Sequence, residues 1–302
     1  MAAPGALIVL IVLGTLAVLT IGEICRELHT FKVTRYSIES DKLPAGAEEL
    51  RLVFLSDLHN REYGPDNERL YQAVRAQRPD LILIGGDMLV GKAGVSFEPA
   101  LRFVRRLPGI CPVYYANGNH EQRMKENPGH YMDCYEKYRR TLEQAGVIFL
   151  ENEFRTVQAG QGFLELRALE LPLNTYRKMK RSRVSAGDVD SLTGRHKDDF
   201  RGREKERFSV LLAHNPVYMD AYMESGADLV LSGHLHGGVV RIPGVGGVIS
   251  PQMFLFPRYS GEMTRKGGQT AIVSRGLGTH SINVRLFNTP ELVLISIRPP
   301  GA

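Results

Sequence analysis

Residues 229–238 read LVLSGHLHGG and place two histidines two positions apart, between an apolar run and two glycines. Successive side chains of an extended strand point to opposite faces, so His234 and His236 would diverge on a regular strand. They converge only where the strand has ended and the backbone bends, which the flanking glycines permit. We therefore expect a buried strand that ends just before the pair, with both histidines facing one shared site.

Polar side chains also follow four other short apolar runs, which read LVFLSDLH, LILIGGD, VYYANGNHE and VLLAHNP. Each alone has an ordinary explanation, since Asp87 fits a turn, Asn119 an Asx turn and His214 a core histidine. Side chains at the carboxyl ends of parallel strands gather along one sheet edge, where ligand sites form. Their joint occurrence therefore predicts one site, made from Asp57, His59, Asp87, Asn119, His120, His214, His234 and His236.

The chain alternates between strand-like and helix-like patterns. Buried strands are expected at 50–56, 80–87 and 112–120, and amphipathic helices at 67–78, 97–107 and 131–145. Short strands follow from 147 to 170, then a strand, helix and strand from 207 to 233, and a glycine-rich region of strands. This alternation is typical of βαβ units and predicts the α/β class.

The first 22 residues contain no Asp, Glu, Lys or Arg, and GALIVLIVLGTLAVLTIG supplies 18 largely apolar residues. That length is close to the ~20 residues that a membrane-spanning helix needs. A cleaved signal peptide is the alternative, but the basic n-region and an A-x-A cleavage site are missing. We predict an uncleaved single-pass anchor in a bacterial cell membrane. Arg26, Lys32 and Arg35 follow the span, which favours a cytoplasmic body; a single weak span can defy that rule, so the side stays open.

The net charge of +5 is local. Residues 172–207 contain eleven Lys/Arg and six Asp/Glu, a surplus of five, so the rest of the chain is about neutral. A nucleic-acid-binding protein would carry a broad basic surface, so we expect no long nucleic acid as a partner. Cys25, Cys111 and Cys134 form no CxxC pair, which argues against a disulfide framework and a cysteine-built zinc site.

The ordered motifs SDLH, GGD, GNHE, AHNP and GHLH resemble the calcineurin-like metallophosphoesterase family from about Leu50 to the C-terminus. With its apolar N-terminus, FPRYS and SRGLGTHSINVRLFNTPELV, the whole chain resembles the membrane-anchored bacterial branch of the YkuE/YaeI type. The resemblance implies a four-layer α-β-β-α sandwich, preceded here by the transmembrane helix. We predict an anchor at 1–22, a linker and leading strand at 23–49, and a metallophosphoesterase domain at 50–302 with a basic insertion at 172–207.

The resemblance also implies two divalent metal ions and a role for each side chain. The first metal would be bound by Asp57, His59 and His236, the second by Asn119, His214 and His234, with Asp87 bridging both. His120 would stand near the leaving oxygen as a general acid. Glu121 either orients His120 or is a solvated carboxylate.

Two cations about 3.5–4 Å apart clamp an in-line displacement at phosphorus and activate the water between them. Neutral imidazoles add ligands without adding charge, which keeps the site positive enough to attract a phosphate. Mixed His, carboxylate and amide ligands suit Mn²⁺, Fe or Zn²⁺ better than Mg²⁺.

The expected reaction is hydrolysis of a phosphodiester, phosphomonoester or pyrophosphate bond, on a lipid or cell-envelope substrate at the bilayer. Phe254 and Phe256 beside Arg258 would offer a lipid phosphate an apolar ledge and a cation, with ordinary packing as the alternative. The basic stretch 176–183 either touches anionic lipid headgroups or is a solvated loop. The alternative functions are a phosphodiesterase on a soluble nucleotide and a non-catalytic tethered binding module on the same fold. The sequence makes no prediction of oligomeric state.

Overall fold

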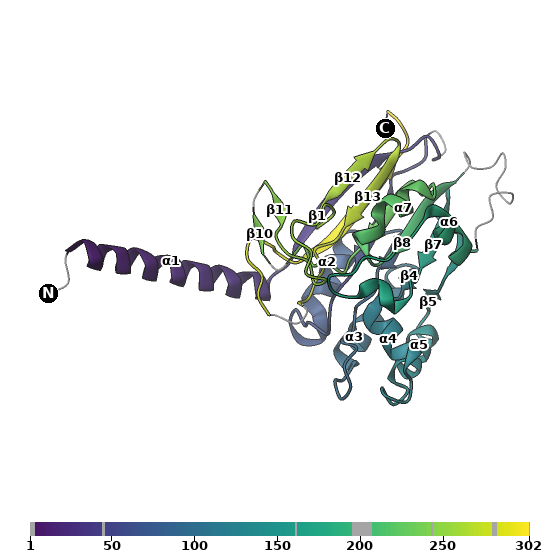
Figure 1. Ribbon diagram of the computed structural model, residues 1–302. Helices are drawn as coiled ribbons and strands as arrows, with labels where there is room; N and C mark the ends of the chain where they lie inside the picture. The colour runs from purple at the N-terminus through teal and green to yellow at the C-terminus, as the bar shows by residue number, and fades with distance from the viewer. Residues whose placement is uncertain are drawn as a thin grey trace.

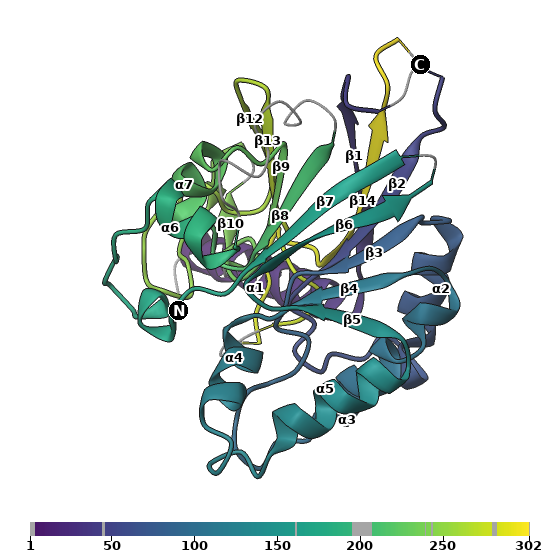
Figure 2. The same cartoon turned by 90° about the vertical axis from the view of Figure 1, so that its right-hand side faces the viewer.

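A computed structural model describes residues 4–43, 46–160, 162–194, 207–238, 240–242, 244–279 and 283–301 (Figure 1). Two six-stranded sheets pack face to face, and helices cover the outer side of each (Figure 2). The strand orders are β1-β14-β2-β3-β4-β5 and β12-β13-β9-β8-β7-β6. The predicted four-layer α/β fold and the apolar N-terminal helix are confirmed.

The first sheet contains β1 (Lys32–Glu39), β2 (Leu50–Leu55), β3 (Leu81–Ile84), β4 (Val113–Ala116), β5 (Val147–Leu150) and β14 (Glu291–Arg298). The second contains β6 (Glu153–Ala159), β7 (Gly162–Leu169), β8 (Phe208–Ala213), β9 (Leu229–Ser232), β12 (Met263–Lys266) and β13 (Gln269–Val273), and a small ribbon pairs β10 (Arg241–Ile242) with β11 (Gly246–Gly247). The α-helices are α1 (Pro4–His29), α2 (Glu68–Ala76), α3 (Glu98–Val104), α4 (Asn119–Glu126), α5 (Cys134–Gln144), α6 (Ala186–Leu192) and α7 (Met219–Glu224).

Burial on both faces explains why the central strands are continuous apolar runs rather than alternating ones. In β2, Leu52 and Phe54 point into the core between the sheets, while Val53 and Leu55 pack toward the layer of α2, α3 and α5. In the second sheet, Val230 of β9 faces a third core that includes residues of α6 and α7. Three apolar cores between four layers therefore stabilise the fold.

Strand direction determines where the site forms. Strands β2, β3, β4 and β5 are mutually parallel, and so are β7, β8, β9 and β13. The loops that leave their carboxyl ends thus emerge together within each sheet. Because the two sheets are stacked, loops from both can meet at one end of the sandwich.

The predicted strand at 112–120 is wrong in its second half. Strand β4 ends at Ala116, and helix α4 begins at Asn119. The carboxylate of Glu121 accepts a hydrogen bond from the Gly118 backbone N–H at 3.1 Å, which caps the first turn of α4. Asn119 and His120 therefore project from the start of a helix.

The predicted basic insertion is partly folded onto the second sheet, and its residues 195–206 lie outside the described part of the chain. Val189 of α6 is buried in the core beneath that helix. Asp190 of α6 pairs at 2.9 Å with the fully buried Arg167 of β7. The exposed part of the segment is centred on residues 177–188.

Helix α1 extends from the body as a 26-residue rod, long and apolar enough to cross a membrane (Figure 1). It runs past the predicted anchor boundary at residue 22 to His29, and β1 begins only three residues later. All eight residues of β1 pair with β14. The predicted linker is thus mostly helix and strand, which leaves little freedom between anchor and body.

Candidate metal centre

The predicted site residues occupy sharp turns at the strand ends. Asp57, His59, Asp87, His234 and His236 all have a positive φ, between 47° and 66°. This left-handed backbone is uncommon for residues other than glycine and is costly, by about 1–3 kcal/mol each, so it persists where the surroundings impose it and clusters at functional sites. The bend at residues 233–238 was predicted from its glycines, but His234 and His236 adopt the left-handed conformation as well.

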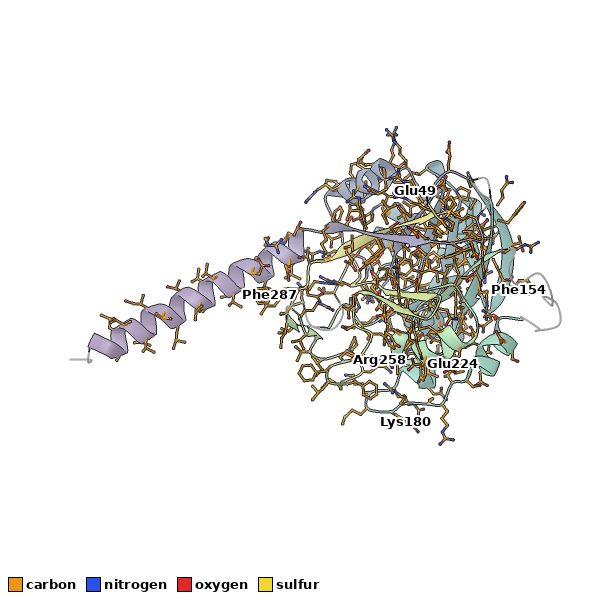
Figure 3. The ribbon with its side chains drawn as sticks, turned by 90° about the horizontal axis from the view of Figure 1, so that it is seen from above. Glu49, Phe154, Lys180, Glu224, Arg258 and Phe287 are labelled. Carbon is orange, nitrogen blue, oxygen red and sulfur yellow. The ribbon has the colours of Figure 1, made fainter. Side chains whose placement is uncertain are left out.

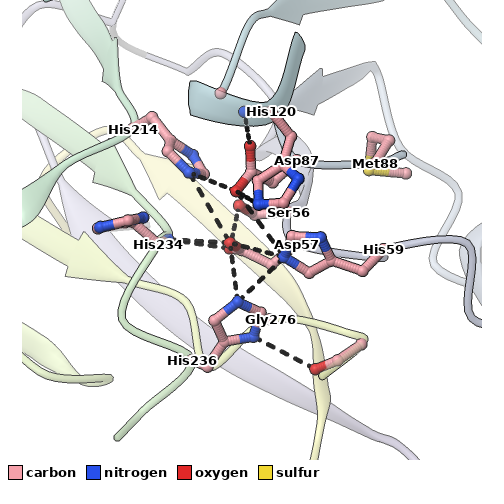
Figure 4. Close-up of polar contacts among 12 residues, drawn as sticks. Ser56, Asp57, His59, Asp87, Met88, His120, His214, His234, His236 and Gly276 are labelled. Carbon is pink, nitrogen blue, oxygen red and sulfur yellow. Dashed lines mark hydrogen bonds and ion pairs between the residues drawn. The ribbon is translucent and has the colours of Figure 1, made fainter. Parts of the chain in front are cut away.

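These turns bring side chains of both sheets to one point (Figure 4). The Nε2 atom of His236 lies 3.5 Å from Asp57 Oδ1 and 3.1 Å from His59 Nε2. On the other side, His214 Nε2 lies 3.2 Å from Asp87 Oδ2 and 3.9 Å from Asp57 Oδ1. Asp87 Oδ2 also lies 3.8 Å from His59 Nε2, so this oxygen stands between the two histidines.

Three overlapping groups have their ligand atoms within 4.8 Å of one another and could bind a metal ion. All members are buried, and the groups are Asp57–His59–His236, His59–Asp87–His120 and Asp87–His214–His234. The first and third contain the ligands predicted for the two metal sites, apart from Asn119, which is an amide, and apart from Asp87 in the first group. Asp87 lies with His214 and His234 in the third group and with His59 in the second, so it links ligands of both predicted sites. The structure thus gathers the predicted residues, and their assignment to particular ions stays a prediction.

The donor set fits divalent cations. Asn119 is buried, and its Oδ1 atom has no hydrogen-bond partner among the described residues, so a cation would satisfy an otherwise costly buried oxygen. Two nitrogens that bind one ion at about 2.0–2.1 Å lie roughly 3 Å apart, close to the His59–His236 separation. Carboxylate, imidazole and amide donors together suit a transition metal.

Backbone contacts separate the histidines into two kinds. The Nδ1 atoms of His214 and His236 lie 2.7 Å and 3.3 Å from the carbonyl oxygens of Gly85 and Gly278, so Nδ1 is the donor and Nε2 keeps its lone pair toward the site. His120 has the opposite arrangement, because its Nδ1 accepts a hydrogen bond from the Gly91 backbone N–H at 2.8 Å. Its proton is therefore on Nε2, which makes His120 a donor toward the site rather than a ligand.

Glu121 is fully buried, which excludes the interpretation of a solvated carboxylate. It accepts hydrogen bonds from the backbone N–H groups of Asp87 and Met88 at 2.8 and 2.9 Å, and from the Tyr115 hydroxyl at 2.8 Å. Burial, and then the nearby charge of Asp87, raise the pKa of Glu121 to about 7. Its observed bonds position the Asp87 loop, a function that sequence spacing could not reveal.

Glycines allow the loops to approach so closely. A Cβ atom on Gly118 would overlap Asp87 Oδ1, and one on Gly233 would overlap Ser56 Oγ and Asp57 Oδ2. Gly118 has φ −94°, so space rather than backbone conformation requires glycine there.

Burial sets the electrostatics of the centre. It raises the pKa of Asp57 to about 6, with the charge of His214 opposing the rise. Burial acts in the same direction on Asp87, but the charges of His214 and His120 outweigh it and hold that pKa well below its usual range. Burial lowers the pKa of His214, and pairing with Asp87 overcomes this and raises it to about 10. Without a cation, protonated imidazole is the counter-charge of the buried carboxylates, which a bound metal would replace.

The predicted substrate contacts lie apart from this cluster. The Arg258 guanidinium is 3.5 Å from Asp220, and it also lies over the Tyr259 ring. The Phe254 ring lies 5.6 Å from the Arg181 guanidinium of the basic stretch. Phe256 is exposed. None of these three residues has a described contact with the gathered Asp and His side chains, and their role in substrate binding stays a prediction.

Tyr176 is a neighbour that the sequence analysis did not identify. Its ring meets that of His234 edge-on, with centroids 5.0 Å apart, and it lies 6.2 Å from that of His214. Its position within the basic stretch gave no sign of this packing, because the contact joins residues far apart in the sequence.

Comparison with known proteins agrees with this geometry. The sequence model of the calcineurin-like phosphoesterase family matches residues 50–238, from β2 to the end of the GHLHGG turn. The chain is 24% identical over 279 residues to the uncharacterized metallophosphoesterase YkuE of Bacillus subtilis (strain 168), covering 90% of this chain and 87% of that protein.

It is 26% identical over 254 residues to the phosphodiesterase YaeI of Escherichia coli (strain K12), covering 83% of each chain. It is also 23% identical over 306 residues to the UDP-2,3-diacylglucosamine pyrophosphatase LpxG of Chlamydia muridarum (strain MoPn / Nigg), covering 89% of this chain and 90% of that protein. With its motifs, its two-sheet fold and its buried cluster of Asp and His at the strand ends, the chain belongs to the calcineurin-like metallophosphoesterases and is an enzyme of that family.

Proposed function

We propose that this enzyme is a membrane-anchored, two-metal phosphoesterase that hydrolyses a phosphodiester or pyrophosphate bond in a lipid or cell-envelope precursor. The observation that carries the proposal is the attachment of an apolar helix directly to the loop beside the metal ligands. Glu27 of α1 accepts a hydrogen bond from the Asn288 backbone N–H at 2.9 Å, and the Asn288 side chain donates to the His236 carbonyl at 2.6 Å.

In this proposal Asp57, His59 and His236 would hold one cation, Asn119, His214 and His234 would hold the other, and Asp87 would be shared. Bound divalent ions neutralise phosphate charge and supply an activated water. The protein orients the ligands through the carbonyls of Gly85 and Gly278, and it fixes the Asp87 loop through Glu121 and through the His120 backbone N–H, 2.8 Å from Asp87 Oδ1.

His120 assists the departing oxygen as a hydrogen-bond donor rather than as the general acid that the resemblance implies. Its Nε2 atom lies 3.9 Å from Asp87 Oδ2, within the buried cluster, and the Gly91 amide that donates to Nδ1 keeps the ring neutral with its proton on Nε2. The group released from phosphorus leaves as an oxygen anion, so the hydrogen bond that Nε2–H donates to it lowers the barrier for a poor leaving group, and solvent supplies the proton that the released oxygen finally takes.

Two of the similar proteins support the reaction class. YaeI is named a phosphodiesterase, and LpxG is named a pyrophosphatase whose substrate carries acyl chains. A phosphodiesterase on a soluble nucleotide is the alternative, but it would gain nothing from a helix tethered to the bilayer. A non-catalytic binding module is disfavoured because it needs neither a complete ligand set nor a hydrogen-bond donor aimed into it.

The activity is tested with full-length protein in lipid nanodiscs. Bis-p-nitrophenyl phosphate and p-nitrophenyl phosphate are compared with Mn²⁺, Zn²⁺ or Fe²⁺ added to protein that has been treated with a chelator. We expect metal-dependent hydrolysis that is faster for the diester. Faster hydrolysis of the monoester would replace the proposed bond type, and equal rates with and without metal would reject the two-metal mechanism.

The metal assignment is tested by elemental analysis of Asp87→Ala. Because Asp87 is the shared ligand, the variant should lose both ions, whereas Asp41→Ala, at an exposed turn, should keep two per chain. Two ions in Asp87→Ala would rule out the bridging role.

A further inference from the structure

A largely apolar cavity of about 330 Å³ lies beside His236. That volume is within the range that proteins use for small organic ligands. The apolar part of its wall consists of Leu235, Val240, Val248, Ile249, Met253 and Val284. We call it the apolar cavity. The proposed hydrolysis of a phosphate ester does not by itself require it.

A second cavity of about 650 Å³ reaches other residues of the same cluster, and we call it the polar cavity. His59 and His120 face it, together with the cationic side chains of Lys92 and Arg123. Thr279 lines both cavities, so they adjoin. Since His59 Nε2 and His236 Nε2 are 3.1 Å apart, both cavities reach the metal ligands; the wall of the first is mostly apolar, with Lys178 and Arg285 also lining it, and that of the second carries Lys92 and Arg123.

The apolar cavity is also next to the membrane helix. Asn288 lines it and donates its backbone N–H to Glu27 of α1. Its neighbour Phe287 has a largely exposed ring and lies by the base of α1 (Figure 3). Ile242 and Val245, in and beside the β10–β11 ribbon, are exposed apolar residues near the same end of the body (Figure 1). A chain leaving the bilayer beside α1 would thus reach the cavity across apolar surface.

We propose that the apolar cavity binds a hydrocarbon chain of a membrane lipid, while the polar cavity receives the anionic group that is released. This inference rests on the proposed phosphoesterase function and specifies its substrate as an amphiphile held in both cavities. The position of α1 selects a lipid over a water-soluble apolar molecule. Lys92 and Arg123 favour a negatively charged leaving group next to His120.

The orientation of the substrate between the two cavities determines which product keeps the phosphate. Hydrolysis joins the oxygen of water to phosphorus and breaks the P–O bond on the His120 side. The departing oxygen accepts a hydrogen bond from His120 Nε2–H as it leaves and takes its proton from solvent, and the phosphate stays on the lipid. The product in the apolar cavity is therefore a lipid phosphate.

The test uses two esters with the same leaving group, p-nitrophenyl methyl phosphate and p-nitrophenyl dodecyl phosphate, with full-length protein in phosphatidylcholine nanodiscs and Mn²⁺. Variants Val248→Trp and Val284→Trp fill the apolar cavity from two directions. Phe163→Trp, at an exposed position of β7, is the control. The measured quantity is the ratio of kcat/KM for the dodecyl ester to kcat/KM for the methyl ester. This ratio is compared between each variant and the wild type, because partition of the dodecyl ester into the nanodisc affects all of them equally.

We expect the wild type to prefer the dodecyl ester by about 10²-fold or more, since each added methylene in an apolar pocket favours binding. Both filling variants should reduce that preference at least about tenfold, mainly through KM, with metal content retained, and Phe163→Trp should not change it. If the wild type shows no preference, or if both variants keep it, the lipid-chain proposal is overturned. Hydrolysis of the methyl ester would then leave the phosphoesterase function standing.

If neither ester is hydrolysed, a binding measurement tests the lipid-chain proposal separately from the proposed phosphoesterase function. Dodecyl phosphate with a terminal diazirine is crosslinked to the metal-loaded protein by light, and mass spectrometry locates the labels. The proposal is supported if the labels lie within 235–253 and at Val284, and if excess dodecyl phosphate prevents this labelling but methyl phosphate does not. Labels confined to α1 overturn it.

Discussion

A single backbone N–H group distinguishes His120 from the histidines around it. His214 and His236 donate through Nδ1 to carbonyl oxygens and present a lone pair, whereas the Gly91 amide leaves His120 with a proton on Nε2. Residue type alone could not separate a metal ligand from a hydrogen-bond donor, because all three are buried histidines that follow strands. The distinction depends on which backbone group each Nδ1 meets.

His120→Ala should therefore keep both metal ions and lose turnover by about 10²–10³-fold, the usual cost of removing one hydrogen-bond donor to a developing oxygen anion. The loss should shrink for p-nitrophenolate and other good leaving groups, whose departing oxygen carries less charge. Rates for a series of aryl and alkyl diesters, together with elemental analysis, check this. Equal losses across the series would argue that His120 positions other groups instead.

Gly118→Ala should lower the metal content of the protein without straining the backbone at this position. Its φ of −94° suits alanine, but the new Cβ would overlap Asp87 Oδ1 and displace the shared ligand. Gly268→Ala is the matched control, because a Cβ there meets nothing within 4 Å. Metal content and diester hydrolysis of the two variants are compared. Wild-type metal content in Gly118→Ala would show that Asp87 can move without losing its ligand function.

At the scale of elements, helix α1 is joined to the catalytic end of the body. Glu27 is buried and accepts hydrogen bonds from the Asn288 backbone N–H and the Thr289 hydroxyl, both at 2.9 Å. Strand β1 then pairs along its full length with β14. Helix α1 and the loop that carries Asn288 consequently behave as one unit.

Glu27→Ala should destabilise this junction by about 1.5–3 kcal/mol, the range for hydrogen bonds to a charged group. Thermal unfolding should shift down, and amide exchange should accelerate at Asn288. Glu23→Ala is the control on the same helix, since Glu23 pairs only with Arg26 among the described contacts. Unchanged exchange at Asn288 would mean that α1 is not anchored through Glu27.

At the scale of the whole molecule, the two stacked sheets assemble the site at one end and α1 leaves from the same region (Figures 1 and 2). Confining an enzyme to the bilayer raises the effective concentration of a lipid substrate and does little for a soluble one. The position of α1 beside the site therefore fits the proposed lipid substrate.

Deleting residues 2–22 should reduce kcat/KM on vesicle-embedded phospholipid or pyrophosphate substrates by about 10²-fold. Hydrolysis of bis-p-nitrophenyl phosphate should not change, because the described side chains from 5 to 22 are not buried in the body. The double variant Phe254→Ala with Phe256→Ala, in the full-length protein, tests the predicted ledge. If the deletion costs nothing on vesicles, and the double variant affects soluble and vesicle substrates alike, the lipid assignment fails and a soluble diester becomes the better substrate class.

The sequence by itself determined the α/β class, the apolar span and the residues that gather at the strand ends, and the four-layer sandwich came from the family resemblance. These features follow from local rules, since apolar periodicity defines a strand and parallel strands deliver their carboxyl ends to one edge. The roles of the gathered residues came from the family resemblance. The sequence misplaced the boundary at residues 116–119, because the Glu121 cap that starts a helix there involves a backbone contact that periodicity does not detect.

Only the tertiary structure decided which contacts each of these residues makes and therefore which role it has. The Gly91 contact with His120, the Glu121 contacts with the Asp87 loop, and the Tyr176 packing on His234 join segments about 30 to 60 residues apart. The apolar cavity likewise combines side chains from the GHLH turn, the β10–β11 region and the loop before β14. Such contacts depend on how loops from two sheets meet, and no periodicity within a single segment encodes that meeting.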